Sequence, residues 1–157
     1  MGVSIRKSVE DRLFLETENG CGLCGHRDSR VLTVHHIEHD ADTADNSYDN
    51  LIVLCHNCHT MYHQGKGLLK QEIIEVKRRL IMKTLTLIGI NALKVATRKG
   101  VVVGAPYTLN HLVELGLVSE HEVFTEIEND EGGISSTQVA YTITDKGARF
   151  VEKWRIQ

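Results

Sequence analysis

The first half of the chain changes between helical and strand-like hydrophobic spacing. Apolar residues at helical spacing over residues 8–19 predict a short helix. Residues 30–37 are rich in β-branched side chains and residues 51–55 are continuously apolar, so we expect two strands joined by a polar loop. Residues 56–65 predict one or two helical turns that end at a glycine. The predicted order is therefore helix, strand, strand, helix.

The segment from residue 67 to residue 99 contains no proline and repeats apolar residues at spacings of three and four, which predicts helix. It is either one helix or two helices broken near Gly89. Its first half is amphipathic and basic, whereas its second half is nearly all apolar. We therefore expect the second half to lie in a core.

The C-terminal part predicts a small unit of its own. A short helix begins after Pro106 and is closed by Gly116. Two strand-like runs follow at residues 122–129 and 137–144, and Asp145 begins a last helix. A helix, a two-stranded hairpin and a second helix form a recognisable compact motif.

The chain has 157 residues, of which 41% are hydrophobic, enough for one medium domain or two small ones. The patterns divide it into residues 1–66, a helical connector at 67–99 and a unit at 100–157, and the fold class is α+β. No apolar run approaches the length of a membrane span, and the N-terminus lacks the apolar stretch of a signal peptide. We expect a cytoplasmic protein with no membrane partner.

The net charge of −3 is unevenly distributed. Residues 64–100 carry nine Lys or Arg side chains against two Glu side chains, while the flanking parts are acidic. Such a segment can bind phosphate, because the local field rather than the total charge attracts a polyanion. The alternative is an ordinary solvated helix face.

All four cysteines occur in Cys-x-x-Cys pairs, Cys21 with Cys24 and Cys55 with Cys58. In a reducing compartment this pattern favours metal over disulfides. Two such pairs supply four tetrahedral ligands, so we predict a structural Zn²⁺ that joins the two ends of the strand-loop-strand segment. The alternatives are a redox dithiol or two unrelated pairs.

Histidines lie close to the second cysteine pair. His59 and His63 are four residues apart on a predicted helix and therefore share one face. His35 and His36 are adjacent on a predicted strand and point to opposite faces, so one can join a metal while the other points elsewhere. Three imidazole ligands leave positions open for water and a phosphate oxygen, and a further imidazole can act as a general base near neutral pH.

These motifs carry a family resemblance. Residues 21–63 resemble the HNH, or ββα-metal, nuclease family in the form that carries zinc knuckles, through Cys-x-x-Cys, VHHI and DNLIVLCHNCH. The HTMYH ending is similar to the colicin-type branch of that family. The resemblance implies a small zinc-clamped ββα-metal domain that hydrolyses phosphodiester bonds of DNA.

The resemblance also implies a role for each residue. His36 matches the general base, Asn50 matches the asparagine that fixes the loop backbone, and His35, His59 and His63 match the ligands of a catalytic divalent ion. That ion would be Mg²⁺, Mn²⁺, Ni²⁺ or Zn²⁺, and His59 counts among the catalytic residues.

Two further predictions concern charged residues around this site. The loop between the predicted strands is acidic, and Asp40 is an additional candidate ligand, although a solvated loop is the simpler interpretation. The basic helix is the expected phosphate contact, with these DNA-binding candidates: Lys66, Lys70, Lys77, Arg78, Arg79 and Lys83.

The C-terminal unit resembles the winged-helix family in its pattern alone. Its helix offers only Asn110 and His111 as polar groups for base readout, and its hairpin is acidic, whereas base readout needs donors near phosphates. DNA binding, homodimerisation and docking of another protein therefore all stay open for this unit.

Three functions follow from these patterns. The first is a metal-dependent DNA endonuclease. The second is a non-catalytic regulatory protein that binds zinc and DNA and has a winged-helix unit. The third is a purely structural zinc adaptor. The combination of a general base with a second set of metal ligands favours the nuclease, because a binding module would not need both.

Overall fold

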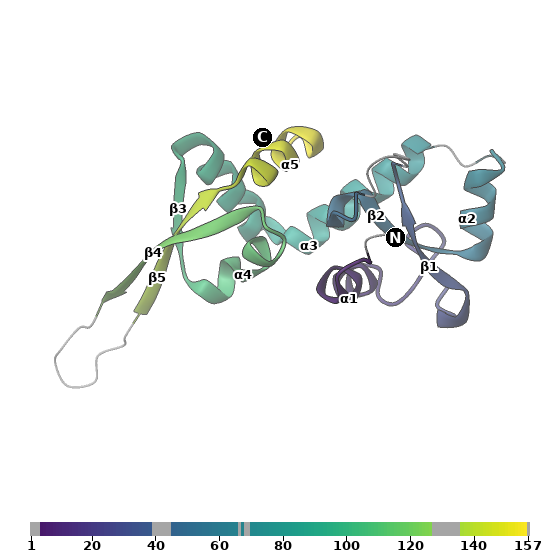
Figure 1. The fold of residues 1–157 in the computed structure, drawn as a ribbon, viewed down its shortest axis with the longest axis horizontal. Helices are drawn as coiled ribbons and strands as arrows, with labels where there is room; N and C mark the ends of the chain where they lie inside the picture. The colour runs from purple at the N-terminus through teal and green to yellow at the C-terminus, as the bar shows by residue number, and fades with distance from the viewer. Residues whose placement is uncertain (1–3, 39–44, 66, 68–69, 127–135, 157) are drawn as a thin grey trace. The chain divides into compact units, whose positions relative to one another are not determined.

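The computed structural model describes residues 4–38, 45–65, 67, 70–126 and 136–156, and shows a mixed α/β protein (Figure 1). The chain divides into two compact units, residues 1–84 and residues 85–157. The helix α3 (Lys70–Lys99) contributes its first half to one unit and its second half to the other. The sequence prediction instead set residues 67–99 apart as a connector.

The first unit is built around an antiparallel two-stranded ribbon of β1 (Leu32–His36) and β2 (Leu51–Cys55), with His36 opposite Leu51. The helix α1 (Lys7–Glu16) packs on one face of this ribbon, and α2 (His56–His63) packs on the other. Short 3-10 turns precede each strand: η1 (Ser29–Val31) and η2 (Tyr48–Asn50). The predicted order of helix, strand, strand and helix is confirmed.

Burial explains why β2 is apolar at every position. All five of its residues are buried, because helices cover both faces of the strand. Ile52 and Leu54 belong to a core that also contains the buried cysteines and, from α3, Ile73 and Val76. The segment that carries the cysteines and the first half of α3 therefore share one hydrophobic core.

The helix α3 is broken at Thr86, where the backbone takes a left-handed φ of 58°. The sequence left open one helix or two helices broken near Gly89, and the break lies three residues earlier than that glycine, which serves packing instead. A Cβ atom at Gly89 would lie 2.5 Å from Nε2 of His111, so the missing side chain lets the helix α4 (Pro106–Glu114) approach. The same Nε2 lies 3.2 Å from the carbonyl oxygen of Leu85, beside the break.

Length and composition alone make α3 apolar enough to cross a membrane, which corrects the expectation that no such run exists. One such helix is weak evidence, because a core helix passes the same test. Leu85, Leu93 and Ala96 in its second half are buried within the second unit, whereas Leu87 and Ile88 are exposed, so the expected burial of this half in a core holds only in part.

The second unit contains a three-stranded antiparallel sheet in the order β3-β5-β4, together with helices. Its elements besides α3 and α4 are β3 (Val101–Gly104), β4 (Val118–Glu126), β5 (Ser136–Ile143) and α5 (Asp145–Trp154). Helices and sheet share a core that includes Leu112, Tyr141 and Trp154. The hairpin and its flanking helices were predicted and β3 was not, while the winged-helix resemblance stays a prediction.

Candidate metal centres

The four cysteines come together in the first unit. Cys21 and Cys24 lie on the segment after α1, while Cys55 ends β2 and Cys58 lies in the first turn of α2. All four sulfur atoms lie within 4.8 Å of one another, so the cysteines are positioned to bind a metal. Sulfurs at about 2.3 Å from a tetrahedral ion lie about 3.8 Å apart, and the Cys24 and Cys55 sulfurs are 3.7 Å apart. The donor set fits zinc.

The thiols of this cluster differ in how readily they ionise. Burial raises the pKa of the Cys58 thiol above its usual value, and neighbouring sulfurs add to the shift. Burial acts in the same direction on Cys21, but backbone N–H groups from Cys24, Cys55 and Leu23 outweigh it and lower the pKa to about 7. Because four adjacent thiolates repel one another, a cation is required to hold all four in the ionised form that ligates metal.

Three histidines form a second cluster on the α2 face of the ribbon. The candidate ligand atoms of His35, His59 and His63 lie within 4.8 Å of one another. Nε2 of His59 and Nε2 of His63 are 3.3 Å apart, which matches two nitrogens at about 2.0 Å from one tetrahedral ion. His35 is buried, His59 is half-buried and His63 is exposed, so the cluster opens toward solvent at one end. The residues present fit a divalent ion with open positions.

His36 does not belong to this cluster. It is the last residue of β1, and strand alternation directs it to the face opposite His35. Its Nε2 lies 2.8 Å from Oδ1 of Asn46. When Nε2 carries the proton and donates it to Asn46, Nδ1 keeps a lone pair that can accept a proton from water. Asn46 was not predicted as a partner of His36, because nothing along the chain links the two residues.

Asn50 is buried at the end of η2 and ties down the chain that follows β1. Its side-chain oxygen accepts a hydrogen bond from the Glu38 amide at 2.9 Å, and its Nδ2 donates to the carbonyls of Glu38 at 3.1 Å and Asp45 at 3.0 Å. This geometry fixes the backbone two residues beyond His36. It is the arrangement that the resemblance assigns to this asparagine, whereas Asp40 lies outside the described residues.

An antiparallel ribbon followed by a helix, with one closed and one open cluster of candidate ligands, defines a small ββα domain whose side chains are positioned to bind metal. Residues 21–65 match the family model for HNH endonucleases, so the chain carries an HNH domain over this segment. The match confirms the resemblance inferred from the sequence motifs. No curated protein and no solved structure matches the chain.

The basic side chains proposed to bind DNA have different surroundings. Lys77 is fully buried and its Nζ lies 2.7 Å from the Glu16 carboxylate, so its assignment to DNA binding is wrong. Lys70 and Lys83 are exposed and pair with Glu38 and Glu18.

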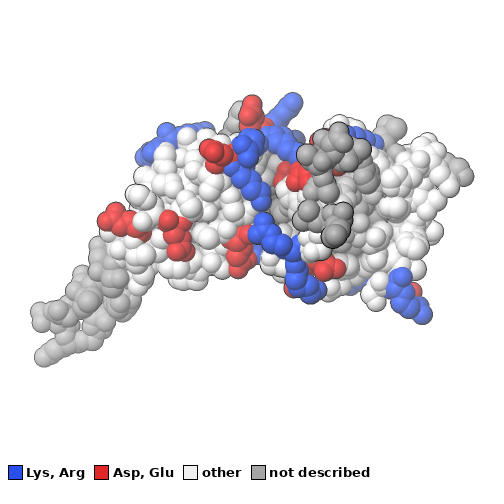
Figure 2. All heavy atoms as spheres, viewed as in Figure 1, with Lys and Arg blue, Asp and Glu red and all other residues white. Residues whose placement is uncertain are grey.

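Two arginines of α3 complete the described part of this set. Arg78 and Arg79 are exposed, and Lys66 lies outside the described residues. Figure 2 shows acidic side chains beside the basic ones on the face it draws. The exposed ion pairs of Lys70 with Glu38 and of Lys83 with Glu18 are weak, so either lysine can bind a phosphate instead.

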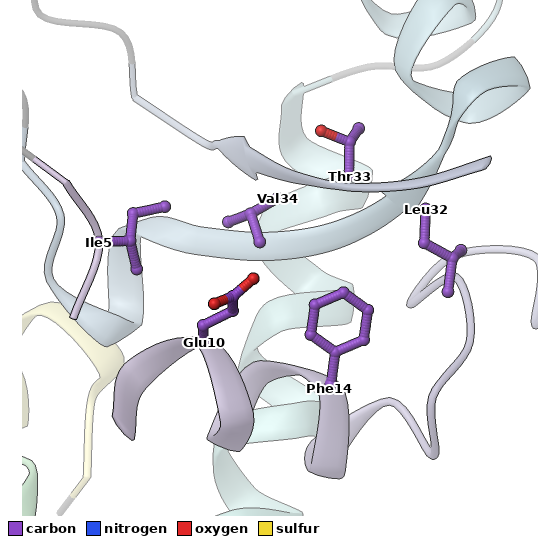
Figure 3. A pocket seen from close by; sticks show the side chains of 6 residues that line it. All are labelled: Ile5, Glu10, Phe14, Leu32, Thr33 and Val34. Carbon is purple, nitrogen blue, oxygen red and sulfur yellow. The ribbon is translucent and has the colours of Figure 1, made fainter. Parts of the chain in front are cut away.

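A shallow cavity of about 440 Å³ lies between α1 and β1, on the face opposite the histidine cluster. Figure 3 shows Leu32 and Val34 pointing from the strand toward Phe14 and Glu10 of α1, while Thr33 points the other way. This view makes the alternation of β1 visible. By the same alternation His36 shares the face of Val34, and His35 shares the face of Thr33.

Proposed function

We propose that the protein is a metal-dependent endonuclease that hydrolyses phosphodiester bonds of DNA. The observation that carries the proposal is the pairing of an open three-histidine cluster with a separate histidine, His36, whose loop is anchored by Asn50. The HNH match over residues 21–65 supports the same reaction class and makes DNA the implied substrate.

In the proposed mechanism, His36 accepts a proton from the water that attacks phosphorus. Asn46 holds the imidazole through its Nε2, and Asn50 fixes the backbone that follows His36. Since His35 and His36 leave the ribbon on opposite faces, the reacting phosphate must lie over the end of the ribbon, where β1 ends at His36.

A divalent ion held by His35, His59 and His63 would supply positive charge next to the phosphate and the leaving 3′-oxygen. We assign a structural Zn²⁺ to the four cysteines, and Mg²⁺, Mn²⁺, Ni²⁺ or Zn²⁺ to the histidines. Cys58 and His59 are neighbours on α2, so the closed cluster sets the position of a ligand in the open one. Such thiols persist in a reducing compartment, which supports a cytoplasmic location.

The test is cleavage of supercoiled plasmid by the full chain across a panel of these divalent ions. Wild type should nick or cut the plasmid, and His36→Ala should abolish cleavage while thermal unfolding and tightly bound zinc stay unchanged. His56→Ala is the matched control, because His56 is an exposed histidine of the same segment outside both clusters. It should cleave like wild type.

Equal cleavage by wild type and His36→Ala would contradict the mechanism. DNA binding without cleavage under every ion would instead favour the non-catalytic zinc-binding regulator. For the second unit, we propose homodimerisation or partner docking alongside DNA binding, and the oligomeric state of the full chain in solution tests the first of these.

A further inference from the structure

A buried ion pair lies against Tyr48, the first residue of η2. Lys77 of α3 is fully buried, Glu16 of α1 is 4% exposed, and Nζ lies 2.7 Å from Oε1. The Tyr48 hydroxyl donates to the other carboxylate oxygen of Glu16, and the Lys77 ammonium lies 3.7 Å from the centre of the Tyr48 ring. The Thr84 hydroxyl also donates to Glu16, at 3.3 Å. We call Glu16, Tyr48 and Lys77 the buried triad.

Stability alone is a poor explanation for the buried triad. Removing two charges from water costs free energy that their attraction only partly offsets, and well-packed apolar side chains in their place are often equally stable or better. An ion pair instead provides structural specificity. The hydrogen bonds of the buried triad are satisfied in only one arrangement of α1, η2 and α3, which supply its three residues. The triad therefore selects one placement of Tyr48 relative to α1 and α3.

Tyr48 begins the turn that carries Asn50. The turn η2 contains only Tyr48, Asp49 and Asn50, and the Leu51 amide closes it by donating to the Tyr48 carbonyl. Burial beside the Glu16 carboxylate raises the pKa of Tyr48 well above its usual value, so its hydroxyl stays a donor. Anchoring Tyr48 at one end of this short turn fixes Asn50 at the other, and Asn50 holds the backbone of Glu38, two residues after His36.

We infer that Glu16, Tyr48 and Lys77, the buried triad, position residues of the proposed nuclease site. The triad holds η2 in place, and through Asn50 it keeps His36 aligned. None of the three residues touches the substrate in this assignment. The inference rests on the proposed function for its catalytic readout, but its structural readout does not depend on cleavage.

The experiment uses the zinc-loaded full chain and the variant Tyr48→Phe, which removes one hydroxyl and leaves the ring and the ion pair in place. We measure hydrogen exchange of the Glu38 amide by NMR, together with kcat and KM for plasmid cleavage. The Glu38 amide should exchange at least about tenfold faster, and kcat should fall by about tenfold with KM and bound zinc unchanged. Asn50→Ala marks the exchange rate of a fully released amide.

Two further variants separate positioning from stability. Tyr141→Phe removes a hydroxyl from a fully buried tyrosine of the second unit and should change neither readout. The double variant Glu16→Gln with Lys77→Met removes both charges together, so no unpaired charge stays buried. It should fold at least as stably as wild type yet show the same faster Glu38 exchange and lower kcat, which a purely structural role would not produce.

Unchanged Glu38 exchange in both Tyr48→Phe and the double variant overturns the inference. Loss of kcat in strict proportion to lost stability overturns it as well. An inactive wild-type protein refutes the proposed function instead, while faster Glu38 exchange in both variants still supports the positioning of the loop.

Discussion

The two ligand clusters share one short helix and differ in how closed they are. Three of the four cysteines are at most 6% exposed, and the cluster joins the two ends of the strand-loop-strand segment. The histidine cluster instead runs from buried His35 to exposed His63. A closed set of four sulfurs leaves no position for a substrate, whereas three imidazoles at a solvent-exposed edge leave one open. Candidate ligands that are neighbours on one helix thus contribute to sites suited to different tasks.

We expect the two clusters to depend on each other unequally. Cys55 and Cys58 bracket the start of α2, so closing the sulfur cluster fixes the helix that carries His59 and His63. We therefore expect the open cluster to depend on the closed one more than the closed one depends on it. The predictions that follow test this asymmetry.

The largest effect is expected for Cys55→Ser. Loss of one sulfur should release the tightly bound zinc and unfold the first unit, since structural zinc contributes on the order of 10 kcal/mol to small domains. Thermal unfolding with and without a chelator, together with zinc analysis, measures this. A variant that melts like wild type after chelation would show that the cysteines do not hold the fold.

A smaller and more selective effect is expected for His59→Ala. One tightly held zinc per chain should remain, the exchangeable ion should be lost, and cleavage should fall by more than about 100-fold, because a direct ligand matters more than the groups behind it. Metal analysis and plasmid cleavage measure both quantities, with His56→Ala as the control. Loss of both ions together would remove the distinction between a closed and an open cluster.

The smallest effect is expected for the double variant Arg78→Ala and Arg79→Ala. If DNA reaches the open cluster along this face of α3, affinity should weaken and the salt dependence of binding should flatten by about 0.9 in slope for each phosphate that the protein no longer neutralises. Both metal contents and kcat should stay as in wild type. The control is Arg98→Ala with Lys99→Ala, an exposed basic pair of the second unit. An unchanged slope in the Arg78 and Arg79 variant would exclude this face.

Local pattern predicted the metal-binding segment well. Residues 51–55 were expected as a strand and form β2, and the helix expected from residue 56 is α2, because an apolar run followed by helical spacing leaves little choice locally. The Cys-x-x-Cys pairs and the spacing of four between His59 and His63 likewise constrain side chains within one turn. Each of these features depends on residues a few positions apart, so local backbone geometry is enough to predict it.

Lys77 shows where local pattern fails. On the sequence it lies beside Arg78 and Arg79 in a basic run, and only the packing of α3 against α1 and η2 makes it face Glu16 and Tyr48. The link between Asn46 and His36 has the same origin, since it depends on the path of the loop between the strands. The α3 break at Thr86 was not predicted at that residue either, and the nearby Gly89 lies instead where His111 of α4 approaches the helix.

The sequence by itself determined which ligands this protein has and which of them are neighbours within a turn. The tertiary structure alone decided how far each ligand is exposed, since the three imidazoles range from buried to exposed beside four sulfurs whose common site the spacing had predicted. It also decided which of the basic residues is buried. The physical reason is that ligand chemistry belongs to individual side chains, whereas burial and distance depend on segments that meet only when the chain is folded.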